Sequence, residues 1–184
     1  MRSMTKTLRC LATACAMMPM LVFVAVTLCA ASEENAEISR LLQEARDHAA
    51  VLSRDADEME AMTRSDVSWE THASMLETMK EHVNDLARVT QELQGKRSMA
   101  SPWQQQAIDR MMPLLKELAA NTTAAINHLK DHNVRPVAGS YPEYLKQNAE
   151  TAHALADMVS SFVRYDETRA QLDRLEHKLE IATK

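Results

Sequence analysis

From Glu33 onward, apolar residues recur at steps of three and four positions, which is the period of an α-helix. Four such stripes follow one another, and segments rich in Gly, Pro, Ser or Asp separate them. They predict helices over about residues 34–63, 68–94, 102–131 and 142–182. No stretch alternates apolar and polar residues as a half-buried strand does. The pattern therefore predicts an all-α protein.

The stripes also predict the core, because four apolar faces of this kind are most simply buried against one another. Charged residues such as Glu37, Arg40 and Glu44 occupy the opposite faces. The side chains expected in the core are Ile38, Leu42, Ala45, Ala49, Leu52, Ala56 and Met59 in the first helix; Trp69, His72, Leu76, Met79, Val83, Leu86 and Leu93 in the second; Ile108, Met111, Leu115, Leu118, Ala125 and Leu129 in the third; and Leu145, Ala149, Ala152, Leu155, Val159 and Phe162 in the fourth.

Local signals mark the ends of two helices. Ser101, Pro102 and Gln104 supply an N-cap, a proline at the first helical position and the glutamine of a capping box. Gly95, one of only two glycines, is a natural terminator for the second helix. Pro113 lies inside the third helix and cannot donate a backbone hydrogen bond, so we expect a kink there.

Short connections between four amphipathic helices favour an up-down-up-down four-helix bundle. The fourth helix is expected to be longer than the others, and its apolar phase slips at Tyr165 before leucines resume. Its extra length has two interpretations. The helix simply overhangs the bundle, or Leu172, Leu175 and Leu179 form a coiled-coil seam for self-association.

Residues 1–31 have the order of regions found in a secretory signal peptide. Met1 to Arg9 carries three positive charges, residues 11–31 are mostly apolar, and small residues precede the polar Ser32. We therefore expect cleavage there, a bundle domain over residues 32–184, and export to the periplasm or beyond the cell. The alternative is an uncleaved anchor in the inner membrane formed by residues 11–31, because about 20 apolar residues in a helix span a bilayer.

Charge and cysteine content narrow the classes of function. The chain has 21 basic and 26 acidic residues, and three basic ones lie in the expected leader, which leaves 18 basic against 26 acidic side chains in the exported part. This balance disfavours nucleic acid as a partner. It leaves the membrane as a partner only if the leader is retained. Cys10, Cys15 and Cys29 all lie in the leader, so the exported part has no disulfide and no cysteine ligand.

Sequence motifs for catalysis are missing from the exported part. It has no glycine-rich phosphate loop, no Gly-x-Ser-x-Gly and no Cys–His pair. The di-iron bundles need two Glu-x-x-His motifs, and only the segment from Glu150 to His153 has that spacing. Most carboxylates fall on the polar helix faces. We therefore expect a protein that is not an enzyme.

Several histidines are expected to meet at one end of the bundle. His72 follows the start of the second helix, His128 and His132 end the third, and Met59 and Met62 end the first. Two histidines one turn apart can hold one metal ion, so His128, His132 and His72 are candidate ligands for a divalent transition metal. In the same end, His72, His132, Met59 and Met62 are candidate axial ligands or contacts for haem b.

A structural role explains the same residues without a cofactor. The helix dipole stabilises a histidine near a helix C-terminus by about 0.3–1 kcal/mol, and methionine is an ordinary core residue. We expect His72 and His132 on the core-facing stripes. His48, His82 and His153 are expected to flank those stripes as half-exposed packing residues. The expectation is therefore no cofactor, with haem b or a divalent metal as the alternative.

Four segments carry a resemblance to a known group: Trp69–Ala73, Pro102–Ile108, Asn121–Leu129 and Tyr141–Leu145. Together they resemble a family of small exported bacterial proteins predicted to be helical bundles, over about residues 41–165. The resemblance implies an envelope protein with an all-helical fold, and it implies no activity, ligand or catalytic residue. The chain is also similar in general plan to soluble b-type cytochrome bundles and to the sensory bundles of bacterial receptors, which is a likeness of fold alone.

These features together predict a non-enzymatic, exported helical bundle of the bacterial envelope that acts by binding or assembly. The expected partner is another protein, or a second copy of the chain through the C-terminal helix. The alternative function is that of a haem- or metal-binding bundle that uses the histidines at one end.

Overall fold

The computed structural model describes the backbone of residues 20–132 and 137–182, and the side chains of residues 36–132 and 137–179. Within these ranges the chain forms four long helices, one turn of 3-10 helix and no strand. In chain order they are α1 (Met20–Met62), α2 (Trp69–Gly95), η1 (Arg97–Met99), α3 (Pro102–Asp131) and α4 (Tyr141–Ala182). The prediction of an all-α protein is therefore confirmed.

Helix α1 begins earlier than its apolar stripe predicts. It starts at Met20, inside the expected leader, rather than near residue 34, and it runs without a break to Met62. Residues 1–19, with the positively charged start of the expected leader, lie outside the described residues. Among the described helices, none is both long and apolar enough to cross a bilayer. The leader, whether cleaved or retained, stays a prediction.

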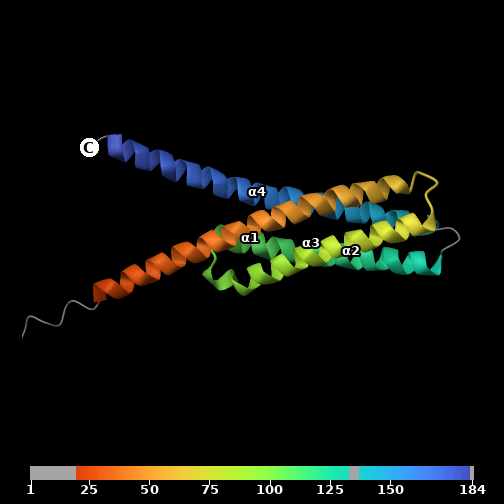
Figure 1. Ribbon diagram of the computed structural model, residues 1–184, viewed down its shortest axis with the longest axis horizontal. Helices are drawn as coiled ribbons and strands as arrows, with labels where there is room; N and C mark the ends of the chain where they lie inside the picture. The colour runs from red at the N-terminus through yellow and green to blue at the C-terminus, as the bar shows by residue number, and fades with distance from the viewer. Residues whose placement is uncertain (1–19, 133–136, 183–184) are drawn as a thin grey trace, which may run out of the picture.

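Each long helix packs against two others. Helices α1 and α3 each lie against both α2 and α4, which gives the elongated arrangement of Figure 1. At one end, the indole N–H of Trp69 in the first turn of α2 donates a hydrogen bond of 2.9 Å to the carbonyl of Leu129 in α3. Toward the other end, the amide of Gln104 in α3 donates to the hydroxyl of Ser39 in α1 at 3.2 Å. The start of α2 and the end of α3 therefore share one end of the bundle.

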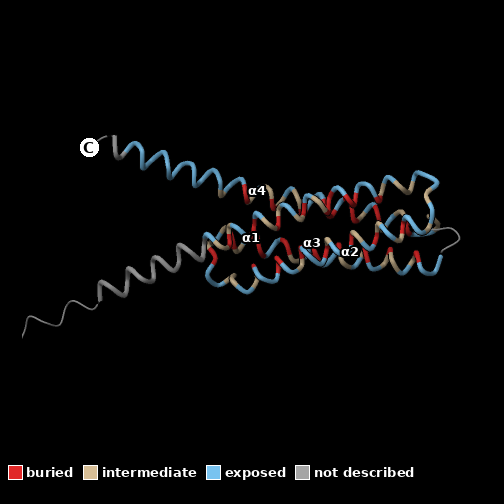
Figure 2. The backbone as a smooth tube through the Cα atoms, viewed as in Figure 1, coloured by how far each residue is buried: buried red, intermediate tan, exposed pale blue. Residues whose placement is uncertain are grey.

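The buried side chains form one core along the facing stripes of the helices, drawn in red in Figure 2. Nearly all residues expected in the core are buried, and Trp69 and Phe162 are half-buried at its edge. The buried stripe of α4 ends at Val163. We call the following residues 166–182 the α4 overhang. The phase slip predicted at Tyr165 therefore coincides with the point where α4 leaves the bundle (Figures 1 and 2).

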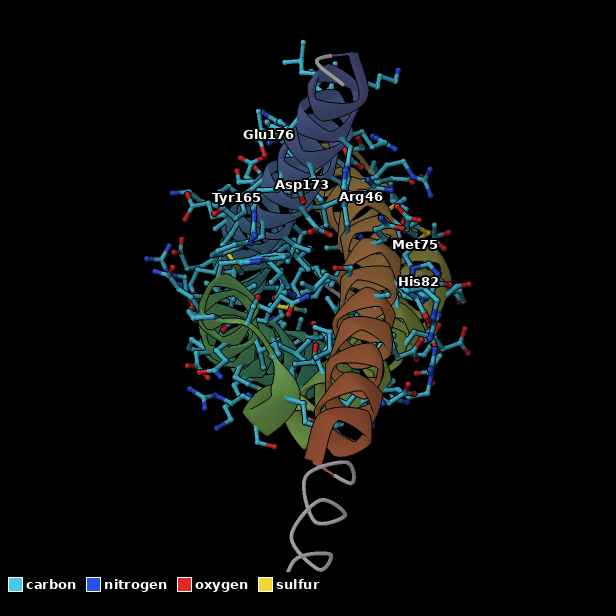
Figure 3. All side chains as sticks on the ribbon, turned by 90° about the vertical axis from the view of Figure 1, so that its left-hand side faces the viewer. Arg46, Met75, His82, Tyr165, Asp173 and Glu176 are labelled. Carbon is cyan, nitrogen blue, oxygen red and sulfur yellow. The ribbon has the colours of Figure 1, made fainter. Side chains whose placement is uncertain are left out.

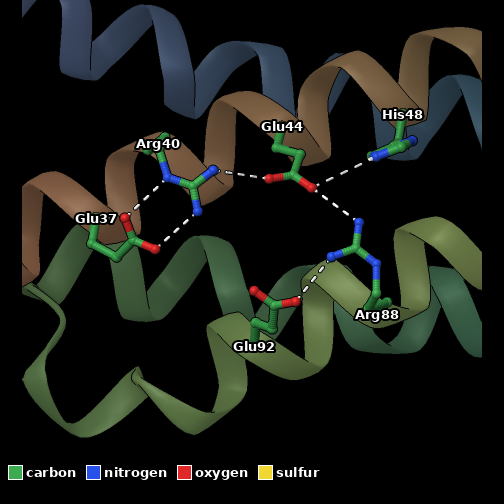
Figure 4. Close-up of polar contacts among 6 residues, drawn as sticks. All are labelled: Glu37, Arg40, Glu44, His48, Arg88 and Glu92. Carbon is green, nitrogen blue, oxygen red and sulfur yellow. Dashed lines mark hydrogen bonds and ion pairs between the residues drawn. The ribbon is translucent and has the colours of Figure 1, made fainter.

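Charged side chains cover the outer surface where α1 meets α2 (Figure 4). Glu44 of α1 accepts hydrogen bonds of 3.1 Å from Arg88 of α2 and from Arg40, one turn earlier in α1. These hydrogen bonds hold the pKa of the Glu44 carboxyl below its usual range. Arg40 also pairs with Glu37, and Arg88 with Glu92, each at 2.9 Å. The polar face predicted from the charge pattern is therefore a connected network that joins two helices.

The start of α3 matches its local sequence signal. The capping box is formed, and the backbone N–H of Ser101 donates a hydrogen bond of 2.9 Å to the side-chain carbonyl of Gln104. Helix α3 then continues through Pro113, which is exposed. Proline has no backbone N–H to donate to the carbonyl one turn earlier. At an exposed position that carbonyl can accept a hydrogen bond from water, so the helix is maintained there.

Candidate functional site

The expected histidine cluster is built around Tyr141, the first residue of α4. The phenol of Tyr141 is fully buried, and its oxygen lies 3.1 Å from Nδ1 of His72 on α2. The rings of these two residues meet edge to face with centroids 5.4 Å apart. The ring of His128 on α3 stacks on Tyr141 at 5.6 Å. Three helices therefore place aromatic side chains together at one end of the core.

His132 joins this cluster from its outer side. Its ring stacks on that of His128 with centroids 4.2 Å apart. Its Nδ1–H donates a hydrogen bond of 3.0 Å to the backbone carbonyl of His128, because His132 is the residue that ends α3 and turns back to cap it. The side chain is exposed. The prediction that His132 faces the core is therefore wrong, although its proximity to His128 is as predicted.

Burial fixes the protonation of the central pair. Burial lowers the pKa of His72 and raises the pKa of Tyr141, so both side chains are neutral near pH 7. The phenol oxygen and Nδ1 of His72 share one hydrogen bond: when the phenol donates, the imidazole proton lies on Nε2, and when Nδ1–H donates, Nε2 carries a lone pair. Among the described residues Nε2 of His72 has no hydrogen-bond partner, and neither has the buried Nε2 of His128. Two imidazole nitrogens at this end are therefore buried without a partner among the described residues.

The methionines of the expected site lie in the core. Met59 is completely buried, and Met62 is half-buried against the same core. Within the described side chains, no group of three or more His, Cys, Asp or Glu residues is placed to hold a metal ion. The structure thus brings His72 and His128 together at Tyr141, and His132 joins them through His128.

Two pairs of acidic and histidine side chains, not predicted from the sequence, tie α1 to its neighbours. Asp55 of α1 is buried and makes a short hydrogen bond to Nδ1 of His82 on α2. On another side of α1, Nε2–H of His153 on α4 donates to Asp57 at 2.7 Å, and its Nδ1 accepts from the hydroxyl of Ser53 at 3.0 Å. Both pairs join helices, and His82 and His153 are therefore more than the packing residues expected.

The Ser53–His153–Asp57 chain has the hydrogen-bond order of a hydrolytic triad, but its surroundings differ. A serine nucleophile needs N–H donors aimed at the oxyanion that forms. Ser53 lies in the middle of α1, where backbone N–H groups are bonded to carbonyls one turn back. The arrangement can hold two helices together, and it offers no free donors beside the serine.

An aromatic groove between α3 and α4 is a second feature that sequence reasoning missed. The ring of Trp103 stacks on Phe162 at 6.5 Å and meets Tyr165 edge to face at 5.5 Å. The guanidinium of Arg110 lies over Phe162 at 6.0 Å, and that of Arg169 over Tyr165 at 5.8 Å. The groove has a volume of about 630 Å³. It lies where α4 leaves the core, at the end opposite the histidines.

No protein-family model, no curated protein and no solved structure matches this chain. The resemblance to small exported bacterial proteins therefore stays a prediction. The assignment of function rests on the side chains described above.

Proposed function

We propose that this chain is a non-enzymatic, exported four-helix bundle of up-down-up-down topology, which acts at the bacterial envelope by binding a protein or by assembling with itself. The observation that carries the proposal is the α4 overhang. It exposes Leu172, Leu175 and Leu179, whose side chains are 55%, 49% and 67% exposed. Leucines at this spacing on one helix are typical of a surface that a second helix covers.

The acid–histidine pairs support a structural role. Each described Asp–His contact joins two helices, as Asp55–His82 and Asp57–His153 do. The short connections between helices, and the contacts that place the start of α2 beside the end of α3, support the proposed topology. The sequence motifs that phosphate or acyl chemistry requires are missing. Reproducible hydrolytic turnover by the purified chain would contradict this part of the proposal.

Export is proposed from the leader sequence, and its test is direct. The chain is expressed in a bacterial host, the cells are fractionated, and the intact mass of the recovered chain is measured. A chain that begins at Ser32 in the periplasm or medium is the expected result. A chain of full length in the membrane fraction would replace cleavage with an inner-membrane anchor, and a chain confined to the cytoplasm would overturn export.

Haem or metal binding is the second candidate function, and one observation favours it. His72 and His128 each have a buried Nε2 without a partner among the described residues, and imidazole nitrogen is a common ligand for iron and zinc. When Nδ1–H of His72 donates the hydrogen bond to the phenol oxygen of Tyr141, the lone pair of Nε2 is available to a metal ion. However, the ring of Tyr141 occupies the space between the two imidazoles, so a haem would have to displace it.

One sample decides between the two functions. The chain is purified from its export compartment without added metal or chelator, and its visible spectrum and metal content are measured. A Soret band or near-stoichiometric metal that is lost in both His72→Ala and His128→Ala, with helicity retained, would establish the second function. A colourless, metal-free and fully helical protein is the result expected for the first.

A further inference from the structure

The leucines of the α4 overhang follow the heptad spacing of a coiled coil. Leu172 and Leu179 are separated by seven residues, and Leu175 lies between them at the second apolar position of the heptad. In heptad notation, Leu172 is at position a, Leu175 at d, and Arg169 and Glu176 are both at e. Figure 3, viewed from the end to which α4 extends, shows Tyr165, Asp173 and Glu176 spaced along this helix.

The two charged e positions are available for contacts outside the chain. The described residues 168–176 are all exposed. The structure gives no ion pair for Arg169 or Glu176 with any described side chain, and the guanidinium of Arg169 lies over the ring of Tyr165 at 5.8 Å. Charged residues that flank an apolar seam set the orientation and register of a coiled coil. Their signs can therefore be used to compare the ways in which two overhangs could pair.

We propose that two copies of this chain associate through their α4 overhangs as an antiparallel pair, in the register that packs Leu172 of each copy against Leu175 of the other. This inference rests on the proposed function and specifies how assembly occurs. In an antiparallel pair, e positions face e positions. This register places Arg169 of each copy beside Glu176 of the other, so that symmetry creates two attractive pairs around four leucines.

Registers one heptad away are disfavoured by charge. If the second helix slides by one heptad toward the bundle of the first copy, Arg169 lies beside Arg169 of the second copy, and Arg164 lies beside Lys178. If it slides by one heptad toward the C-terminus of the first copy, Glu176 of one copy lies beside Glu176 of the other, and Lys178 lies beside Lys178. Like charges at such short range oppose association.

The parallel arrangement is also disfavoured. There, each g position faces the next e position of the second helix. Arg164 of each copy would therefore face Arg169 of the other, which creates two repulsive pairs and leaves Glu176 opposite the uncharged Gln171. The antiparallel arrangement additionally places the two bundles at opposite ends of the shared helix pair. The overlap of residues 165–182 is about 27 Å long, so the dimer is expected to be weak and to dissociate on dilution.

The test is a charge reversal whose effect has opposite signs in the two orientations. Sedimentation equilibrium is measured over a concentration series on the chain as recovered from its bacterial host. In the antiparallel dimer, Arg169→Glu places a glutamate of each copy beside Glu176 of the other, which creates two repulsive pairs and raises the dissociation constant about tenfold. In a parallel dimer the same change replaces repulsion with attraction and lowers that constant. The double variant Arg169→Glu/Glu176→Arg restores the antiparallel pairs, and its dissociation constant is expected to return close to that of the unaltered chain.

Two controls separate this result from other causes. Arg174→Glu makes the same change in charge at position c, on the outer side of the helix, and should leave the dissociation constant unchanged. Leu172→Asp should abolish the dimer, which shows that association does not come from the leader, and circular dichroism checks that each variant keeps its helix content. An unaltered chain that stays monomeric, or an Arg169→Glu variant that behaves like Arg174→Glu, overturns the inference. Neither result contradicts export or binding to another protein, because the mass and fractionation tests measure these independently.

Discussion

The side-chain amide of Asn148 donates a hydrogen bond of 3.2 Å to the hydroxyl of Thr122 in the centre of the bundle, where both residues are buried. The same amide also contacts the sulfur of Met79 at 3.8 Å. Asn148 lies seven residues after Tyr141 on α4, and Met79 lies seven residues after His72 on α2. The core therefore contains two polar layers one heptad apart, each of which connects α4 to α2.

Removal of the Thr122 hydroxyl is expected to destabilise the protein. The change Thr122→Val keeps the shape of the side chain but leaves the amide of Asn148 with a single weak acceptor in a buried site. The expected loss in the free energy of unfolding is about 1–2 kcal/mol, measured by urea denaturation. The matched control is Thr123→Val on the exposed face of α3, where the hydroxyl bonds only to the carbonyl of Ala119, and this change should cost less than about 0.5 kcal/mol.

The free energy of unfolding should fall as the pH drops below about 6.5, because His72 takes up a proton more readily in the unfolded chain. Burial lowers the pKa of His72 in the folded state. The unfolded chain therefore takes up a proton at this residue at a higher pH than the folded chain does, and each such proton favours unfolding. The stabilisation is complete above the unfolded value of about 6.5, and it is lost progressively as the pH falls toward the depressed folded value.

The measurement is the urea midpoint between pH 8 and pH 5. His72→Gln should reduce the slope of stability against pH in this interval. Leu76→Ala, one turn further along α2 and equally buried, should lower stability at every pH and keep the slope. A slope that His72→Gln leaves unchanged would assign the pH dependence to other groups.

The two acid–histidine pairs on α1 should differ in strength because they differ in burial. The side chain of Asp55 is 10% exposed and that of Asp57 is 51% exposed. Loss of the carboxylate removes the acidic partner of a histidine on the neighbouring helix in each case, and His153 keeps its hydrogen bond with Ser53. We expect Asp55→Ala to cost about 1–3 kcal/mol and Asp57→Ala less than about 1 kcal/mol in the free energy of unfolding. Equal losses would show that burial does not control these contacts.

The two glycines should respond to alanine with opposite signs. Gly139 has a φ of +61°, and a Cβ there would lie 3.3 Å from Cε1 of His128. Gly139→Ala is therefore expected to destabilise the protein by about 1–2 kcal/mol, and nuclear magnetic resonance should show a shifted His128 ring signal. Gly95 lies at the end of α2 with nothing within 4 Å of an added Cβ. Gly95→Ala should stabilise the protein by up to about 1 kcal/mol.

Features of the fold that depend on neighbouring residues were predicted well. The capping box at Ser101 and Gln104 placed the start of α3 at the correct residue, because its two hydrogen bonds are local. Core residues such as Leu42 and Leu115 followed from the helical period alone. The slip in the period at Tyr165 lies close to the point where α4 leaves the bundle. The start of α1 at Met20 was missed, because the polar residues after the leader resemble a helix boundary.

Features of the candidate site that depend on distant residues were predicted less well. The sequence grouped His72 with His128 from topology, but the central role of Tyr141 follows only from the depth at which α4 begins. The buried position of Asp55 was not predicted, because a carboxylate carries no local sequence sign of a partner on another helix. Its partner His82 lies on another helix. The core-facing prediction for His132 failed because the last residue of a helix turns away from the direction of its stripe.

The order of the helices has a consequence for the rate at which the protein folds. Three of the four helix interfaces join helices that follow one another in the chain, and only the α1–α4 interface closes over a long separation. Ser53 and His153, which meet across it, are 100 residues apart. Local hairpins form quickly, and a long loop closes at a higher cost in entropy. We therefore expect the α1–α4 interface to form last, so that in stopped-flow experiments His153→Ala accelerates unfolding and leaves the refolding rate nearly unchanged.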